Sequence, residues 1–416
     1  MSDDKVNASE WLKIGEALND VRNIEIGGKR RNLELDGLRG IAILMVIFCH
    51  TILFRAPGWE SPVVLSGWAG VDLFFVISGF LISGLLFAEY RRNGTIRFKR
   101  FAIRRALKIY PAFYALVILS VFINLRTTNP KVVLVAFLHD LFFMQSYASG
   151  TYGHFWSLSV EEHFYILLPL ALYFMMRRSK PEDADPFRFV PWLFAIVAPA
   201  VLIARLLTAR YVVPFNWQTH LFPTHLRIDS LLFGVLLSYW ANFHSEKFWG
   251  FVRPRCHLFL LVGIFLVSPL FLVSQYDRWM YTFGFTVLYA GFGALLLGML
   301  SVRVELWPKV LQLVPRTLAF IGGYSYSIYL WHIPWLMLLG YLHVIRIPYL
   351  GLAAFVFGAI AVGIVTSKLI EIPAIRLRDR LYPSSTAPDS TVTGVSGTQV
   401  AFAPAPLRAI RISEVD

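Results

Sequence analysis

Long apolar blocks, separated by short polar and basic loops, run along most of the sequence. A membrane-spanning helix needs about 17–25 mostly apolar residues. Eleven blocks approach that requirement: 38–54, 67–88, 108–125, 131–147, 156–176, 189–208, 226–242, 257–274, 281–301, 317–340 and 349–370. The pattern predicts an all-α polytopic membrane protein.

The block at 131–147 is the weakest of the eleven. It carries His139 and Asp140 and runs into a stretch of Gly, Ser and Tyr residues. If this block does not span, the inside segments hold 31 Lys and Arg residues and the outside loops hold six. That asymmetry follows the positive-inside rule. We therefore predict ten transmembrane helices with both termini in the cytoplasm.

Composition supports this fold class and excludes others. Of the 416 residues 56% are hydrophobic and 16% are charged, which is too apolar for a soluble or a disordered chain. Two cysteines exclude a disulfide scaffold. The net charge of +13 is accounted for by topology, so we predict no nucleic-acid partner.

The same patterns divide the chain into three parts. We expect a cytoplasmic N-terminal segment at 1–34 and a membrane domain at 35–380. Residues 381–416 are rich in Ser, Thr, Ala and Pro, which predicts a disordered cytoplasmic tail.

Two ionisable residues lie on one stripe of the first predicted helix. Arg39 and His50 are eleven residues apart, about three helical turns, which separates them by about 16 Å along the axis. Arg39 is expected at the cytoplasmic mouth and His50 near the outer end. Ionisable groups inside a membrane are costly and are often functional. Taken singly, a snorkelling arginine and a packed histidine would also explain them.

Carboxylates on two other helices are expected at the depth of His50. Asp72 and Glu161 both lie close to the outer ends of helices that enter from outside. His50, Asp72 and Glu161 thus form a predicted ring, in which a carboxylate orients the histidine as a general base. A structural polar network joining three helices is the alternative. Glu162, about 100° further round its helix, is expected to point elsewhere.

A basic cluster and one further histidine complete the candidate residues. Eight basic residues fall between 91 and 108, and Arg104, Arg105 and Lys108 begin the third predicted helix. Topology and contact with anionic lipids would account for such a loop, but these side chains can also hold phosphates. His332 lies among aromatic residues. The pattern is equally compatible with a packing role and with a catalytic role for this histidine.

Five motifs, in this order, carry a resemblance to a known family. They are LDGLRGIAILMVIFCH at 35–50, GVDLFFVISGFLIS at 70–83, FKRFAIRRALKIYP at 98–111, FWSLSVEEHFY at 155–165 and YSYSIYLWHIP at 324–334. Together they resemble the type-3 acyltransferase family of integral-membrane O-acyltransferases.

The resemblance implies about ten helices and transfer of an acyl group, usually acetyl, to hydroxyls of carbohydrates or similar acceptors. It implies a cytoplasmic acyl-CoA donor, acetyl-CoA above all, and a bacterial cytoplasmic (inner) membrane. A basic residue and a histidine with ten residues between them in that family match Arg39 and His50. Its basic motif matches Arg104, Arg105 and Lys108, although an arginine is common at the position of Lys108. Any extracytoplasmic transferase would be a separate partner protein.

These expectations define a predicted site without a metal. Its catalytic residues are His50, Glu161 and Asp72, and its donor-binding residues are Arg39, Arg104, Arg105 and Lys108. The basic residues would hold the donor phosphates, while His50 would deprotonate an acceptor hydroxyl from the outer side. A transporter or flippase of a glycan or lipid-linked sugar is the main alternative, and a structural or sensory membrane protein is another.

Overall fold

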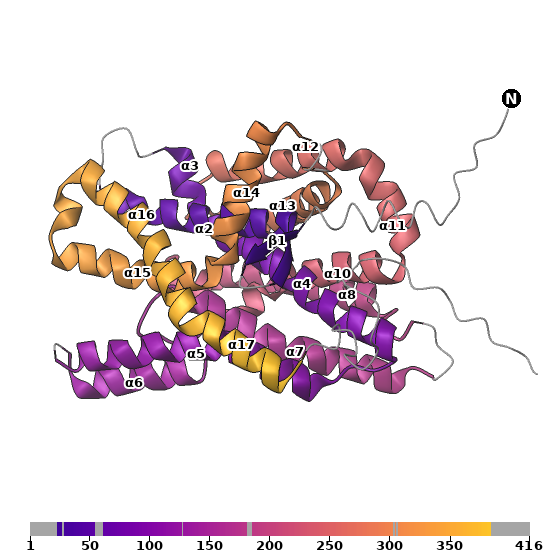
Figure 1. Ribbon diagram of the computed structural model, residues 1–416, viewed down its shortest axis with the longest axis horizontal. Helices are drawn as coiled ribbons and strands as arrows, with labels where there is room; N and C mark the ends of the chain where they lie inside the picture. The colour runs from indigo at the N-terminus through magenta and orange to yellow at the C-terminus, as the bar shows by residue number, and fades with distance from the viewer. Residues whose placement is uncertain are drawn as a thin grey trace, which may run out of the picture.

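The structure is a computed structural model that describes residues 23–26, 29–54, 61–126, 128–180, 185–302, 304 and 307–383. Most of the predicted N-terminal segment and the predicted tail from residue 384 lie outside these residues. A small antiparallel hairpin, β1 (Asn23–Ile26) and β2 (Lys29–Asn32), precedes a body made of helices (Figure 1). The prediction of a helical membrane protein is confirmed.

The helices of the first half include the elements that carry most of the predicted site. In chain order they are α2 (Leu33–His50), η1 (Thr51–Phe54), α3 (Pro62–Leu65), η2 (Ser66–Ala69), α4 (Gly70–Asn93), α5 (Phe98–Asn124), α6 (Pro130–Leu141), α7 (Phe155–Arg178) and α8 (Val190–Tyr211).

The second half contains more short and interrupted helices. They are α9 (Trp217–His220), η3 (Thr224–Leu226), α10 (Ile228–Phe243), α11 (Ser245–Val252), η4 (Arg253–Arg255), α12 (Cys256–Val267), η5 (Ser268–Phe271), η6 (Met280–Gly284), α13 (Phe285–Ser301), α14 (Lys309–Gly323), α15 (Ser325–Tyr341), η8 (Val344–Arg346), α16 (Pro348–Thr366), η9 (Ser367–Glu371) and α17 (Ile372–Leu381).

Eight helical segments within the described residues are long and apolar enough to cross a membrane. They are Leu33–Phe54, Ser66–Asn93, Phe98–Asn124, Phe155–Arg178, Val190–Tyr211, Ser245–Phe271, Met280–Ser301 and Pro348–Leu381. Each coincides with one of the ten predicted spans. The predicted span at 226–242 corresponds to α10, which is apolar but shorter.

The predicted continuous helix at 317–340 is wrong. The chain forms two helices there, α14 and α15, which meet at Tyr324. Gly322 and Gly323 immediately precede the break, and glycine weakens a helix interior. A Cβ atom on Gly322 would lie 1.8 Å from the carbonyl oxygen of Asp36, so this position serves close packing of α14 on α2.

The segment at 131–147, which we predict not to span, contains a short helix. α6 has 12 residues, a length of about 18 Å, which is well below the thickness of a hydrocarbon core. It packs beside α5 at the lower edge of the molecule (Figure 1). Its last turn is followed by a loop that leads back into α7.

Close backbone contact also joins α4 to α10. A Cβ atom on Gly79 would lie 1.9 Å from the carbonyl oxygen of Leu231. Two buried apolar clusters surround this contact, one shared by α5, α7 and α15 and the other by α13 and α4. Close contacts at glycine and the two apolar clusters determine how α2, α4, α5, α7 and α15 face one another. These five helices carry the cavity described in the next subsection.

The short α6 generates a topology prediction. Single cysteines at Arg126→Cys and Ser149→Cys, in a chain with Cys49 and Cys256 replaced by serine, should both react with a membrane-impermeant maleimide in intact cells. Both positions are exposed, and both lie outside if α6 does not cross. Mass-tagging of the purified protein measures the reaction.

Arg178→Cys, at the cytoplasmic end of α7, is the matched control and should react only after permeabilisation. Reaction of only one of the two outer cysteines would mean that the chain crosses the membrane between them and would contradict the ten-span topology.

Candidate active site

A cavity of about 100 Å³ lies among α2, α4, α5, α7 and α15. Its charged lining residues are Arg39, Arg105, Lys108 and Glu161, and its hydroxyl-bearing residues are Ser78, Ser157, Ser325, Tyr326 and Tyr329. Apolar side chains from α4, α5 and α7 complete the wall. Three cations and several hydroxyls around one cavity suit an anionic ligand with additional polar groups.

Three of the four predicted donor-binding residues therefore line one cavity. Arg39 forms an ion pair with Asp36, with 3.4 Å between Nη1 and Oδ1. The guanidinium of Arg105 lies 4.0 Å from the ring centroid of Tyr165 and donates a hydrogen bond to its hydroxyl. Lys108 follows Arg105 by three residues, so both face the same side of α5.

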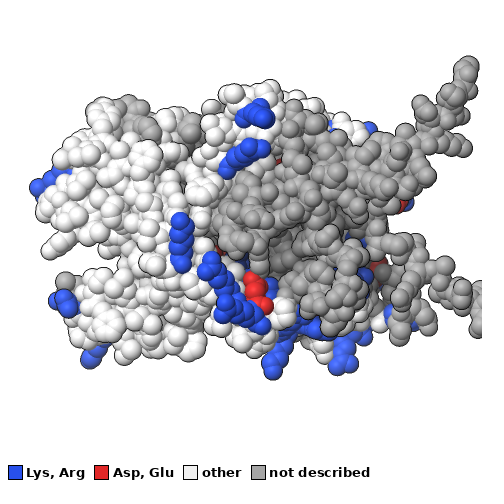
Figure 2. Space-filling view, viewed as in Figure 1, with Lys and Arg blue, Asp and Glu red and all other residues white. Residues whose placement is uncertain are grey.

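Arg104, the fourth predicted donor-binding residue, has a different location. Its guanidinium donates a hydrogen bond to the Tyr382 carbonyl and forms a 3.1 Å ion pair with Asp379. These contacts attach the C-terminal helix α17 to α5. Figure 2 shows Lys and Arg side chains gathered over this region, with acidic groups beside them. Arg104 thus contacts α17, and it is Arg105 that lines the cavity.

The predicted ring of His50, Asp72 and Glu161 is not assembled among the described residues. Glu161 accepts a 2.5 Å hydrogen bond from Ser78 and acts electrostatically on Arg105. It thus belongs to the basic cavity, although the helical depth argument placed it beside His50. Asp72 pairs with Arg227, as described below.

Glu162 does not line the cavity, in keeping with the expectation that it points elsewhere than Glu161. It accepts a 3.2 Å hydrogen bond from Tyr110, and its charge acts on Arg105 as that of Glu161 does. Arg105 offsets two acidic groups that a hydrocarbon environment alone would not tolerate.

Asp72 belongs to a buried network of four charges. Its carboxylate accepts a 2.6 Å hydrogen bond from Arg227, and Arg205 pairs with Asp229 at 2.5 Å. All four side chains are at most 2% exposed. The guanidinium of Arg227 lies 3.7 Å from the ring centroid of Phe285. Two opposite pairs leave the network neutral and link α4, α8 and α10.

Histidines from three parts of the chain meet at the C-terminal end of α2. The ring centroid of His332 on α15 lies 5.0 Å from that of His50 and 5.0 Å from that of His154, just before α7. His332 is fully buried. Burial lowers the pKa of His154 to about 3, so this ring is neutral at physiological pH. His50 therefore faces other imidazoles, where the sequence predicted carboxylates.

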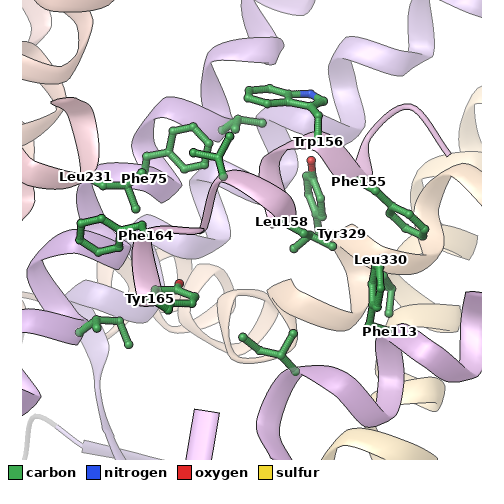
Figure 3. Close-up of a cluster of buried hydrophobic side chains, with 14 of the residues drawn as sticks. Phe75, Phe113, Phe155, Trp156, Leu158, Phe164, Tyr165, Leu231, Tyr329 and Leu330 are labelled. Carbon is green, nitrogen blue, oxygen red and sulfur yellow. The ribbon is translucent and has the colours of Figure 1, made fainter. Parts of the chain in front are cut away.

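Tyr329 and Ser157 separate the histidines from the basic cavity. Both line the cavity, and their hydroxyls are 2.5 Å apart. The Tyr329 hydroxyl also donates a hydrogen bond to the His154 carbonyl, and its ring lies 5.5 Å from that of His332. In Figure 3 Tyr329 lies beside Leu158 on α7. Tyr329 thus contacts both the cavity and the histidines.

Sequence reasoning missed His154, Arg227 and Tyr329 as site residues. His154 lies just outside the predicted span at 156–176, so it was not counted as intramembrane. Arg227 did lie in a predicted span, and the rule that a buried charge needs a partner could have paired it with Asp72. No sequence signal singled out Tyr329 among its aromatic neighbours.

Within the described residues, no group of three His, Cys, Asp or Glu side chains is arranged to hold a metal ion.

Comparison with known proteins adds family information. The family described as "Acyltransferase domain" matches residues 32–368. O-acetyltransferase OatA of Staphylococcus aureus is 29% identical over 322 residues, which is 72% of this chain and 50% of that protein. A second S. aureus protein, named a putative O-acetyltransferase, is 29% identical over 324 residues, 72% of this chain and 49% of that protein.

The chain spans about half the length of the curated relatives it matches. No solved structure matches it.

The buried charge network generates a stability prediction. Asp72→Ala should leave Arg227 buried without its carboxylate, and loss of one partner of a buried pair costs about 3–5 kcal/mol. We expect a large fall in the melting temperature of the purified protein in detergent, measured by intrinsic fluorescence. Asp379→Ala, at the more exposed pair with Arg104, is the control and should change stability by about 0–1 kcal/mol. Equal, small effects of the two substitutions would contradict a stabilising role for the network.

Proposed function

Because the chain belongs to the acyltransferase family that matches residues 32–368, we propose that it is a membrane O-acyltransferase. It moves an acyl group, acetyl in the first instance, from cytoplasmic acyl-CoA to a hydroxyl of a cell-envelope or secreted glycan. Its place is the cytoplasmic membrane of a bacterium. The relatives named as O-acetyltransferases support this reaction class, and no observation favours the transporter alternative.

The arrangement of the basic cavity carries this proposal. Acyl-CoA has anionic phosphates at one end and a thioester at the other. Arg39, Arg105 and Lys108 bind the phosphates, because guanidinium groups and ammonium groups are the usual partners of phosphate. The hydroxyls of Ser78 and Tyr329 line the same cavity and bind polar groups further along the donor.

His50 is the general base in this proposal. Its Nδ1 atom lies 2.8 Å from the Val46 carbonyl oxygen, which can only accept, so Nδ1 carries the hydrogen. The Nε2 atom therefore has a free electron pair for the acceptor hydroxyl. The oxygen of that hydroxyl then forms a bond to the acyl carbon, the thiolate of coenzyme A leaves, and the proton passes to the leaving group.

The two predicted carboxylates have separate roles here. Glu161 lies in the cavity beside Arg105 and Ser78 and sets the position of both. Asp72 acts through Arg227, whose guanidinium lies 5.5 Å from the ring of Trp156, next to Ser157 at the cavity wall. Asp72 is thus a positioning residue.

Transfer itself is tested with purified protein in nanodiscs. The protein is incubated with radiolabelled acetyl-CoA and a panel of cell-envelope glycans, and label on the glycan is measured after separation. We expect label to appear on one acceptor class as an alkali-labile ester, with release of free coenzyme A. Binding of a glycan without any consumption of acetyl-CoA would overturn the proposal in favour of a transporter.

The donor site predicts a difference between two neighbouring arginines. Arg105→Ala should weaken acyl-CoA affinity roughly ten- to a hundredfold, because a charge-assisted hydrogen bond is worth about 1.5–3 kcal/mol. The loss should be larger at low salt, where screening is least. Arg104→Ala is the matched control, since its side chain contacts α17, and its affinity should stay near wild type. Equal losses in both variants would contradict the placement of the phosphates in this cavity.

The general base predicts a second, separable effect. His50→Ala should insert and bind acyl-CoA normally but lose transfer by at least about a hundredfold, because general-base catalysis contributes about 10²–10⁴. Single-turnover transfer and acyl-CoA binding are measured on the same preparation. Transfer above about a tenth of the wild-type rate is incompatible with this role.

A further inference from the structure

The three histidines share a feature that the proposed reaction does not yet use. Each donates one ring N–H to a backbone carbonyl: His50 Nδ1 to Val46 at 2.8 Å, His332 Nδ1 to Tyr329 at 2.5 Å and His154 Nε2 to Leu330 at 3.2 Å. A carbonyl only accepts, so these contacts assign the tautomers. The second nitrogen of each ring is left with an unshared electron pair.

Two of these electron pairs are buried without a partner. Among the described residues, Nε2 of His332 and Nδ1 of His154 are buried and have no hydrogen-bond donor. A buried acceptor left unsatisfied costs about 1–3 kcal/mol, so such a group usually has a partner in some state of the protein. The ring of His332 lies beside that of His50, and the ring of His154 lies beside that of His332.

The spacing of the rings fits a shared proton. Three neutral acceptors cannot bond one another, but one added proton turns a ring into a donor toward the next. Two imidazoles joined by a hydrogen bond of about 2.9 Å have centroids on the order of 5 Å apart. The observed separations are 5.0 Å for His50 and His332 and 5.0 Å for His332 and His154.

We propose that His50, His332 and His154 act as one proton-accepting unit during acyl transfer. The proton that leaves the acceptor hydroxyl binds Nε2 of His50, and a hydrogen bond to Nε2 of His332 stabilises the resulting imidazolium. When that proton moves to Nε2 of His332, it can be shared with Nδ1 of His154 in place of Nε2 of His50. The proton finally reaches the thiolate of the released coenzyme A, so the atoms of the reaction balance. His332 and His154 are positioning residues that act through His50.

The surroundings of the unit add few other titratable groups. Tyr329 on α15 and Tyr152 before α7 face the rings, and Glu161 on α7 acts on Tyr329. On α4, Asp72 is paired with Arg227. The part of α16 from residue 350 to 366 carries no titratable side chain.

On α2 itself, Cys49 packs on η2, away from the rings. The imidazole nitrogens are therefore the main proton acceptors in this part of the protein, and an added proton binds to one of the three rings.

This inference rests on the proposed function, and a pH profile of transfer tests it. In the wild type, the rate should fall as pH drops and the unit becomes protonated. His332→Phe keeps an aromatic ring but removes the electron pair that stabilises the protonated form. The midpoint of the acid limb of kcat/KM for the acceptor should therefore move about one to two units to lower pH, and the plateau rate should fall.

His332→Gln is the matched control, because its amide oxygen can accept a hydrogen bond near the position of Nε2. The acid-limb midpoint of this variant should therefore shift less from the wild-type value than that of His332→Phe. His154→Phe should give a smaller shift in the same direction, and it keeps the test decisive if His332→Phe does not fold. A profile of both Phe variants that superimposes on wild type, with only a lower rate, would show a structural role and overturn the proposal.

Two other outcomes are distinguishable. If the wild type transfers no label to any hydroxyl acceptor, the proposed function fails, whatever the histidines do. If the wild type loses transfer with 1,10-phenanthroline and regains it with Zn²⁺, the electron pairs bind a metal, and the shared proton is overturned while the acyltransferase function stands.

Discussion

Charges inside this protein are tolerated because they meet opposite charges on other helices. Arg205, Asp229, Arg227 and Asp72 form two ion pairs that are almost completely buried. In hydrocarbon an unpaired charge costs several kcal/mol, so α4, α8 and α10 cannot rotate or separate without exposing one. The orientation of α4 is thereby determined, and with it the wall of the cavity that Ser78 lines.

Charges around the cavity are also near opposite charges, but their arrangement differs from that of the buried network. The charges of Glu161 and Glu162 both act on Arg105, while Arg39 is paired with Asp36 on its own helix. The described lining still holds more cations than anions. The charge network beside α10 is closed and neutral, whereas three cations line one cavity, where an anionic donor binds in the proposed reaction.

The histidines lie beyond Tyr329, on the other side from the cations. In the proposed reaction, this arrangement separates the groups that would bind an anion from the group that would accept a proton, so the positive charge of Arg105 does not oppose protonation of His50 at close range. Only Tyr329 and Ser157 stand between the two regions. In the proposed reaction, a thioester at that position would lie between the cations that hold the phosphates and the base that deprotonates the acceptor hydroxyl.

Much of the fold could be predicted from the chain alone, because helix length and hydropathy are local properties that a bilayer constrains strongly. Eight of the ten predicted spans are long apolar helices, and α6 is short. The break at Tyr324 was not predicted. Gly322 and Gly323 mark it, but whether a glycine pair breaks a helix depends on the close approach of α2, which is a tertiary contact.

The sequence also shows which residues share one face of a single helix. Arg105 and Lys108, three residues apart, were predicted to act together, and both line one cavity. The predicted ring failed because depth along a helix axis does not give the direction in which a side chain points. In the packed structure Asp72 on α4 points toward Arg227, and Glu161 on α7 points toward Ser78. Packing of α15 against α2 places His332 beside His50. The sequence determined which groups enter the membrane, and packing of the helices decided which of them meet.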